Sequence, residues 1–173
     1  FVRSYQLTLL EASLYYGAIL LVGGIAGIWM GGSLADRFGA DKRRMYAIIP
    51  AVAFLATIPF YVGAVMSSSL AISFVLFLVP TALGLVWLGP VLSSIQHVVP
   101  TNMRATASAV FLFVNNLIGI GLGTVALGAL SDALSVQFGA DSLRYAILAG
   151  TVFYLVAASL FLLSAKRLER DWV

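Results

Sequence analysis

The densest group of ionisable side chains lies between residues 36 and 44, where two acids accompany four bases. Asp36 and Arg37 stand side by side, so they have the chemistry of a proton-transferring pair, and Arg43 and Arg44 follow them. A carboxylate in this place can also face the positive N-terminus of a neighbouring helix. Because the pair ends a long apolar run, we favour a gating or latching role over catalysis.

Two amides, Asn115 and Asn116, stand near the middle of another apolar run. A polar side chain at such a depth is costly unless it has a partner, so it usually faces a bundle interior or a water-filled cavity. The amides therefore either contact substrate or solvent in a pathway, or bond across helices for about 1 kcal/mol each. Successive helical residues point about 100° apart, so we expect different roles for the two.

Trp87 stands in a segment that glycine and proline interrupt, between Gly84 and the pair Gly89-Pro90. Discontinuous helices near the middle of a membrane often build binding sites for a transported solute. Trp87 is therefore a candidate for the same pathway as the amides. The alternative is a large side chain that fills space beside small glycines.

Arg104 and His97 lie on either side of Pro100, at one end of the run that contains the amides. We expect Arg104 to begin a helix and to contact loops or lipid headgroups, with substrate contact as the alternative. His97 is the single histidine of the chain. Its pKa range permits a proton relay, and packing at the interface is the other interpretation.

The composition indicates that these residues are positioned by helices in a membrane. Hydrophobic residues make up 61% of the chain and charged ones 10%, against roughly 45–50% and 25% in soluble domains. No charged residue occurs in 12–35, 45–103, 105–131 or 145–165. At roughly 20 residues per span, these gaps hold one, two, one and one spans. We predict an all-α integral membrane protein with five transmembrane helices, at about residues 9–34, 45–65, 70–98, 103–130 and 143–164.

Local signals refine three of these helices. Thr8 and Glu11 have the spacing of a capping box at the start of the first helix. Glycines at 23, 27 and 31 give that helix one face that another backbone can approach closely. Pro80 and Pro90, with the glycines between them, are expected to break the third helix.

The basic residues favour one orientation. With the segment 36–44 in the cytoplasm, five alternating crossings also place Arg104 and the C-terminal tail there. Eight of the ten basic residues are then inside, and only Arg3 and Arg144 face out, as the positive-inside rule requires. We therefore predict a multi-pass protein of the cell's cytoplasmic membrane, with a cytoplasmic C-terminus.

Several classes of function are disfavoured. Basic residues in short clusters between apolar runs are typical of membrane loops, so we expect no nucleic-acid partner. Glu11, Asp36 and Asp132 all fall near helix ends, so no carboxylate lies within a predicted membrane core. Nothing resembles a phosphate-binding loop, a nucleophile elbow or a metal-ligand cluster. We expect no enzymatic activity, cofactor or metal.

The stretch Gly32-Ser33-Leu34-Ala35-Asp36-Arg37-Phe38-Gly39 resembles the G-x-L-A-D-R-x-G signature of the major facilitator superfamily. In that family the signature follows the second helix of each six-helix half. Four more spans follow it here, so the resemblance implies helices eight to twelve of the C-terminal bundle, with residues 1–6 as the outer end of helix seven. It implies gating roles for Gly32, Asp36, Arg37, Gly39, Arg43 and Arg44, and an N-terminal half that lies outside this chain.

A second stretch, from Val99-Pro100 through Arg104-Ala105 to Ser131-Asp132, is similar to Spinster-like members of that superfamily. Several eukaryotic members export lysophospholipids or sphingosine phosphate. The resemblance therefore implies a lipid-like or amphipathic organic anion as substrate. In mid-helix eleven the eukaryotic members tend to carry a histidine and an acid, where this chain has the two amides.

Together these patterns predict part of a secondary active transporter that works by alternating access. Its expected partners are a small organic or lipid-like solute, a coupling proton or sodium ion, membrane lipid and the N-terminal half. The alternative is a membrane scaffold or assembly protein that does not transport.

Overall fold

The computed structural model describes residues 6–39, 41–168 and 170, and the regular structure in these ranges is helical. The α-helices in chain order are α2 (Leu9–Leu34), α3 (Met45–Met66), α4 (Leu70–Leu83), α5 (Leu88–Val98), α6 (Arg104–Val114), α7 (Gly123–Phe138), α8 (Ser142–Gly150) and α9 (Val152–Leu168). Of residues 1–6, predicted to be the end of a preceding helix, only Gln6 lies within the described ranges. Arg3, predicted to face outward, therefore lies outside them.

These helices combine into five spans that are long and apolar enough to cross a membrane, which confirms the predicted class and number. The α4 and α5 helices form one span with a break between them. The fourth span is continuous from Thr101 to Phe138, because a π-helical segment, Asn115–Leu122, joins α6 to α7. The α8 and α9 helices meet at Thr151 and form the fifth.

The first helix begins as its sequence predicts. The Thr8 hydroxyl accepts a hydrogen bond from the Glu11 backbone N–H at 3.3 Å. The Glu11 carboxylate in return accepts one from the Thr8 backbone N–H at 2.9 Å. Two backbone donors at the helix start are thus satisfied, and the capping box is confirmed.

The fourth span ends later than the predicted boundary at Leu130. The helix continues through Ser131 and Asp132 to Phe138, because neither polar residue prevents helical geometry. It ends where Gly139 adopts a φ of +52°, a conformation that glycine reaches without a Cβ penalty. At about 1.5 Å per residue, the 38 residues of this span measure about 57 Å and exceed the thickness of a bilayer.

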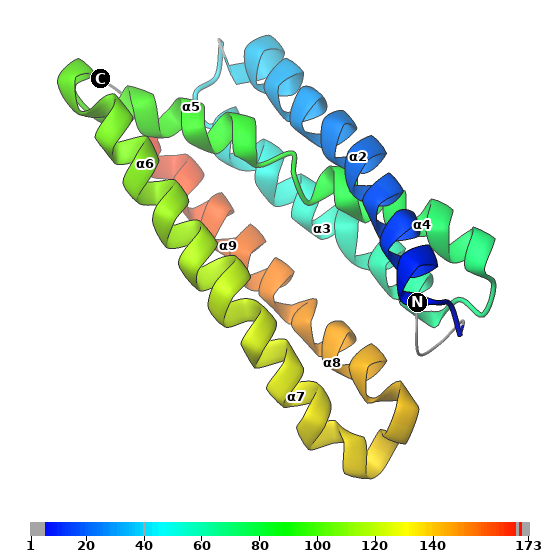
Figure 1. Ribbon diagram of the computed structural model, residues 1–173. Coiled ribbons are helices and arrows are strands. Elements are labelled where there is room, and N and C mark those ends of the chain that lie inside the picture. Colours follow the sequence, from blue (N-terminus) through cyan, green and yellow to red (C-terminus); the bar gives the residue numbers. More distant parts are fainter. Residues whose placement is uncertain (1–5, 40, 169, 171–173) are drawn as a thin grey trace.

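The spans are arranged as two groups (Figure 1). The α2, α3 and α4–α5 helices lie together, with α4 packed against both α2 and α3, while α2 and α3 scarcely touch each other. The α6–α7 helix lies at the other side, where it contacts α5 at one end and α8 further along. The fifth span connects the groups because α9 packs along α3.

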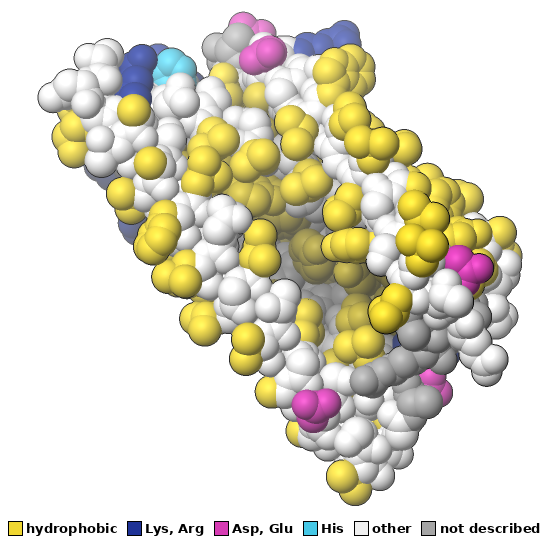
Figure 2. Space-filling model, viewed as in Figure 1, with side chains coloured by type: hydrophobic (Ala, Val, Ile, Leu, Met, Phe, Trp, Pro, Cys, Tyr) yellow, Lys and Arg dark blue, Asp and Glu magenta, His cyan; other side chains and the backbone are white. Residues whose placement is uncertain are grey.

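The connection from α2 to α3, the connection from α5 to α6 and the end of α9 all lie at one end of the bundle (Figure 1). On the face in view, Lys and Arg side chains gather mainly at this end (Figure 2). The predicted grouping of basic residues on one side therefore agrees with the fold. The same face is hollowed between the α6–α7 helix and the α2–α4 pair, and hydrophobic side chains cover the hollow.

Two small apolar clusters hold the helices together. Ile49 and Ala53 of α3 meet Val86, which lies in the break between α4 and α5. Ala51 and Phe54, also on α3, meet Ala158 of α9. Because both clusters are built on α3, this helix is the centre of the packing.

The glycine face of α2 lies directly against the α4–α5 span. A Cβ atom at Gly27 would collide with the carbonyl oxygen of Ala82, and one at Gly31 with the carbonyl oxygen of Val86. Each glycine therefore directs a Cα–H bond at a carbonyl, a weak hydrogen bond that recurs where helices pack closely. The close approach predicted for this face is present.

We expect Gly31→Ala to lower the free energy of unfolding by about 1–3 kcal/mol, because the added methyl group must push two backbones apart. Gly17→Ala on the same helix is the matched control, since a Cβ atom at Gly17 would meet no neighbouring helix within 4 Å. Thermal unfolding of the purified protein measures both variants. Equal melting temperatures would contradict the close packing.

Candidate functional site

The break between α4 and α5 is the most distinctive backbone feature among the described spans. Residues 84–87 turn without completing the α-helical ladder, and short bonds such as Leu85 N to Ala82 O (3.0 Å) replace part of it. Pro90 has no N–H, so the carbonyl of Val86 lacks its usual partner four residues on. That carbonyl is the one that lies against Gly31. The predicted break of the third span is thus present at residues 84–87, where α2 packs against it.

Trp87 lies at the end of the break, immediately before α5, and is half-buried. Its ring meets the ring of Phe111 on α6 edge to face, with centroids 6.0 Å apart. The indole also packs against the cluster of Ala51, Phe54 and Ala158. Through these contacts Trp87 lies where the break, α3 and α6 meet.

One face of the α6 helix carries polar groups that the described residues leave unsatisfied. The Nε atom of Arg104 and the hydroxyl of Ser108 are buried, and neither has a hydrogen-bond partner within the described ranges. A buried polar group without a partner costs about 1–3 kcal/mol. Arg104, Ser108, Phe111 and Asn115 follow the spacing of a single helical face. This face therefore carries an arginine at one end, an amide at the other, and the contact with Trp87 between them.

Asn115 and Asn116 differ in the structure, as their angular separation predicts. The Asn116 side-chain N–H group donates to the Leu112 carbonyl at 2.7 Å, within its own helix. Asn115 is half-buried and Asn116 exposed. Asn115 also begins the π-helical segment, and such segments occur frequently at functional sites. Asn115 is thus the better candidate for contact with a solute.

The segment that carries Asp36 and Arg37 is helical up to Gly39 rather than a loop from Asp36 onward. Residues Ala35–Gly39 form a π-helical turn that extends α2. Asp36 and Arg37 are exposed on this turn, and the Arg37 guanidinium lies 5.8 Å from the centroid of the Phe38 ring. Exposure leaves both charges available to another part of the protein.

The two glycines of the signature lie close to neighbouring helices in different ways, because a Cβ atom on Gly32 itself would meet nothing within 4 Å. Gly32 crosses Gly89 of α5, where a Cβ atom on Gly89 would lie 3.0 Å from the Gly32 nitrogen. Gly39 lies beneath the ring of Tyr46, which leaves no room for a side chain. The signature therefore connects the end of α2 to both α5 and α3. The basic residues that follow it, Arg43 and Arg44, are exposed.

The candidate residues do not form a single site. Asn115 lies eleven residues beyond Arg104, which is about 17 Å along a helix. The half-buried His97 lies in the last turn of α5, at the same end of the bundle as Arg104. The structure thus gives a region near the break, containing Trp87 and Asn115, and a separate region at the end that carries the signature.

The sequence interpretation missed two members of the α6 face, Ser108 and Phe111. Their spacing from Arg104, four and seven residues, was a readable signal because such residues share one side of a helix. What the sequence could not supply was the neighbour, since the contact of Phe111 with Trp87 depends on the path of the chain after the break.

Comparison with known proteins identifies the family. The family model described as Major Facilitator Superfamily matches residues 1–124. An MFS-type efflux pump of Mycolicibacterium smegmatis is 32% identical over 170 residues, which cover 98% of this chain and 39% of the pump. Protein spinster homolog 1 of Xenopus laevis is 27% identical over 170 residues, which cover 93% of this chain and 32% of that protein.

Solved structures share the fold. A bacterial homolog to the human lysosomal transporter Spinster, in an inward-facing and unoccupied conformation, superposes with a TM-score of 0.89 at 24% identity. The match covers 99% of this chain and 43% of that one. An occupied inward-facing structure of such a homolog gives a TM-score of 0.83.

The five spans therefore define a multi-pass helical membrane bundle. The chain belongs to the major facilitator superfamily, and Spinster homologs are among its relatives. It spans between about a third and two-fifths of the length of these curated relatives.

We expect Trp87→Ala to lower the free energy of unfolding by about 2–3 kcal/mol, less than the loss of a fully buried aromatic because the ring is half-buried. Trp87→Phe should retain most of the stability, since a ring still reaches Phe111. Trp29→Ala is the matched control because that side chain is 71% exposed. Equal melting temperatures for the two alanine variants would show that Trp87 does not hold these helices together.

Proposed function

We propose that this chain is part of a secondary active transporter that moves a small organic or lipid-like solute by alternating access. The observation that carries the proposal is the broken α4–α5 span, held against the glycine face of α2 and joined to α6 through Trp87. Discontinuous helices of this kind form the binding sites for substrate and coupling ion in many transporter folds, where one bundle rocks against the other.

The substrate contacts that we propose are on the α6 face. Asn115 would contact the solute near the middle of the span, and Trp87 would line the pathway beside it. The unsatisfied Nε of Arg104 and hydroxyl of Ser108 would bind a polar or anionic group at the end of the bundle. An amphipathic organic anion fits this combination, and the relationship to Spinster homologs supports it.

Asp36 and Arg37 would act as a gate rather than as an acid and a base. Both are exposed on the turn that ends α2, so their charges can bind a helix N-terminus or an acidic loop of the N-terminal half. Arg43, Arg44 and His97 would support this closed end. We assign the end to the cytoplasm, together with the C-terminus, because it carries eight of the ten basic residues.

The coupling ion in this proposal is a proton or a sodium ion. Glu11, Asp36 and Asp132, the acids nearest the apolar runs, all lie toward helix ends. A carboxylate of the N-terminal half, or one of these three, would therefore titrate or bind sodium. Transport by the full-length protein in vesicles, with and without each ion gradient, tests this part.

We expect Asn115→Ala to slow transport of a fluorescent lysophospholipid by about tenfold, as the loss of about 1.4 kcal/mol of substrate interaction implies. Asn116→Ala is the matched control, because its amide already donates to its own helix at 2.7 Å. Rates are measured with the full-length protein in proteoliposomes. Equal rates for the two variants would remove Asn115 from the pathway.

We expect Asp36→Asn to shift the balance of inward- and outward-open states by about two- to thirty-fold, the range of a charge at a helix N-terminus. The matched control is Asp41→Asn, an exposed acid in the same segment but outside the signature. Reactivity of single cysteines at the two ends of the full-length protein reports the balance. An unchanged balance in Asp36→Asn, or the same change in both variants, would contradict the gate.

A further inference from the structure

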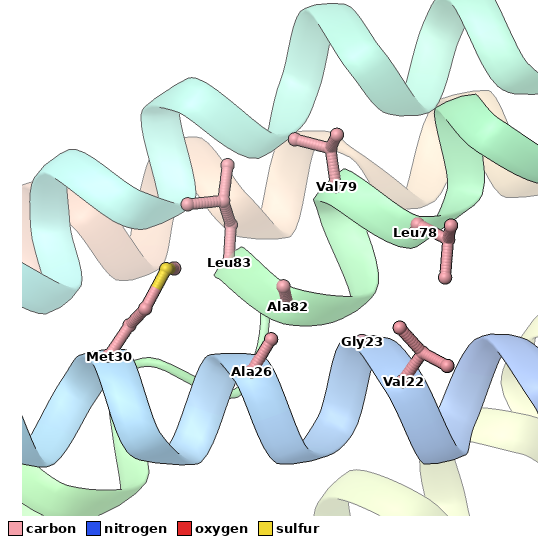
Figure 3. Close-up of a pocket in the computed structure, with 8 residues that line it drawn as sticks. All are labelled: Val22, Gly23, Ala26, Met30, Leu78, Val79, Ala82 and Leu83. Carbon is pink, nitrogen blue, oxygen red and sulfur yellow. The ribbon is translucent and has the colours of Figure 1, made fainter.

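An apolar groove runs between α2 and α4 (Figure 3). Its volume is about 290 Å³, and all of its lining side chains are apolar or glycine. The residues that matter here are Val22, Ala26 and Met30 on α2, with Val79, Ala82 and Leu83 on α4. The groove lies within two helical spans that are long and apolar enough to cross a membrane.

The groove follows from the way the helices pack. Contact between the α2 backbone and the α4–α5 span is closest at Gly27 and Gly31, and α3 packs on the other side of α4. Because α2 and α3 scarcely touch each other, the surface of α4 between them stays uncovered. Val22 at the rim is 56% exposed. Among the described residues, the groove is thus open at the end where Val22 lies.

Basic side chains stand beyond one end of this groove. An apolar cluster extends from the groove to the α2–α3 connection. Its members include Met30, Leu34, Met45, Ile49, Leu83 and Val86. That connection carries Lys42, Arg43 and Arg44, all exposed, against one acid at Asp41. Lys and Arg side chains are visible at this end in Figure 2.

The depth of the groove matches one leaflet. At about 1.5 Å per residue, Met30 lies about 10 Å and Val22 about 22 Å from Arg37 along α2. Headgroup layers are about 5–7 Å thick and half of the hydrocarbon core is about 15 Å. A lipid whose headgroup lies beside the basic residues would therefore place its acyl chain in the groove.

We infer that this groove binds one acyl chain of an anionic phospholipid from the inner leaflet, with the headgroup held by Lys42 and Arg44. Hydrophobic burial in the groove and the attraction of a phosphate-bearing headgroup to the basic connection act on the same molecule.

The test is native mass spectrometry of the full-length protein, released from nanodiscs of equal parts dioleoyl phosphatidylglycerol and dioleoyl phosphatidylcholine. We expect the protein to retain phosphatidylglycerol at least threefold over phosphatidylcholine. Ala26→Phe, which fills the groove, should lower the retained phosphatidylglycerol several-fold. Ile25→Phe is the matched control, since that neighbouring side chain is 65% exposed and lies outside the groove lining.

A second variant leaves the helix packing untouched. Lys42→Gln combined with Arg44→Gln should remove the preference for phosphatidylglycerol, because the protein then lacks both positive charges that bind the headgroup. Equal retention of the two lipids by the unmodified protein would overturn the inference. So would equal retention by Ala26→Phe and Ile25→Phe, the result expected if another part of the protein covers the groove.

Discussion

The close contact between the glycine face of α2 and the carbonyls of the α4–α5 break is the constraint on which the rest of the structure depends. Pro90 removes the donor that would normally satisfy the Val86 carbonyl, and the absence of a side chain at Gly31 lets α2 approach that carbonyl. In a membrane, where apolar surface gains nothing from leaving water, such close backbone packing drives helix association. The break is therefore an organised part of the bundle.

The position of α2 has consequences on both of its sides. On one side it leaves α3 apart from α2, which opens the apolar groove over α4. On the other side the break turns Trp87 toward Phe111, so that α6 meets the bundle through an aromatic contact. The proposed pathway residues and the proposed lipid groove thus both depend on the same helix crossing.

Much of this fold could be predicted because a membrane imposes strong rules on sequence. The gaps between charged residues predicted the five spans, and the spacing of Thr8 and Glu11 predicted where the first helix begins. The break needed more than proline, because α3 contains Pro50 and Pro59 and stays a single helix. Pro80, which was expected to break the third span, also lies inside a helix, since α4 continues past it to Leu83. The break begins only at Gly84 and ends shortly before Pro90. No sequence signal that we could recognise predicted the π-helical segment at Asn115. The partners of Trp87 could not be predicted either, because they depend on the path of the chain in space.

The central claim is that this bundle moves as a unit against an N-terminal half. The chain has no cysteine, so spin labels can be placed at Lys42 and at Ser68, which lie at its opposite ends, each paired with a label at the matching end of the N-terminal half in the full-length protein. Pulsed electron resonance distances, measured with and without a bound lysophospholipid, should change in opposite directions at the two ends. Distances that stay fixed at both ends, or that change together, would contradict alternating access.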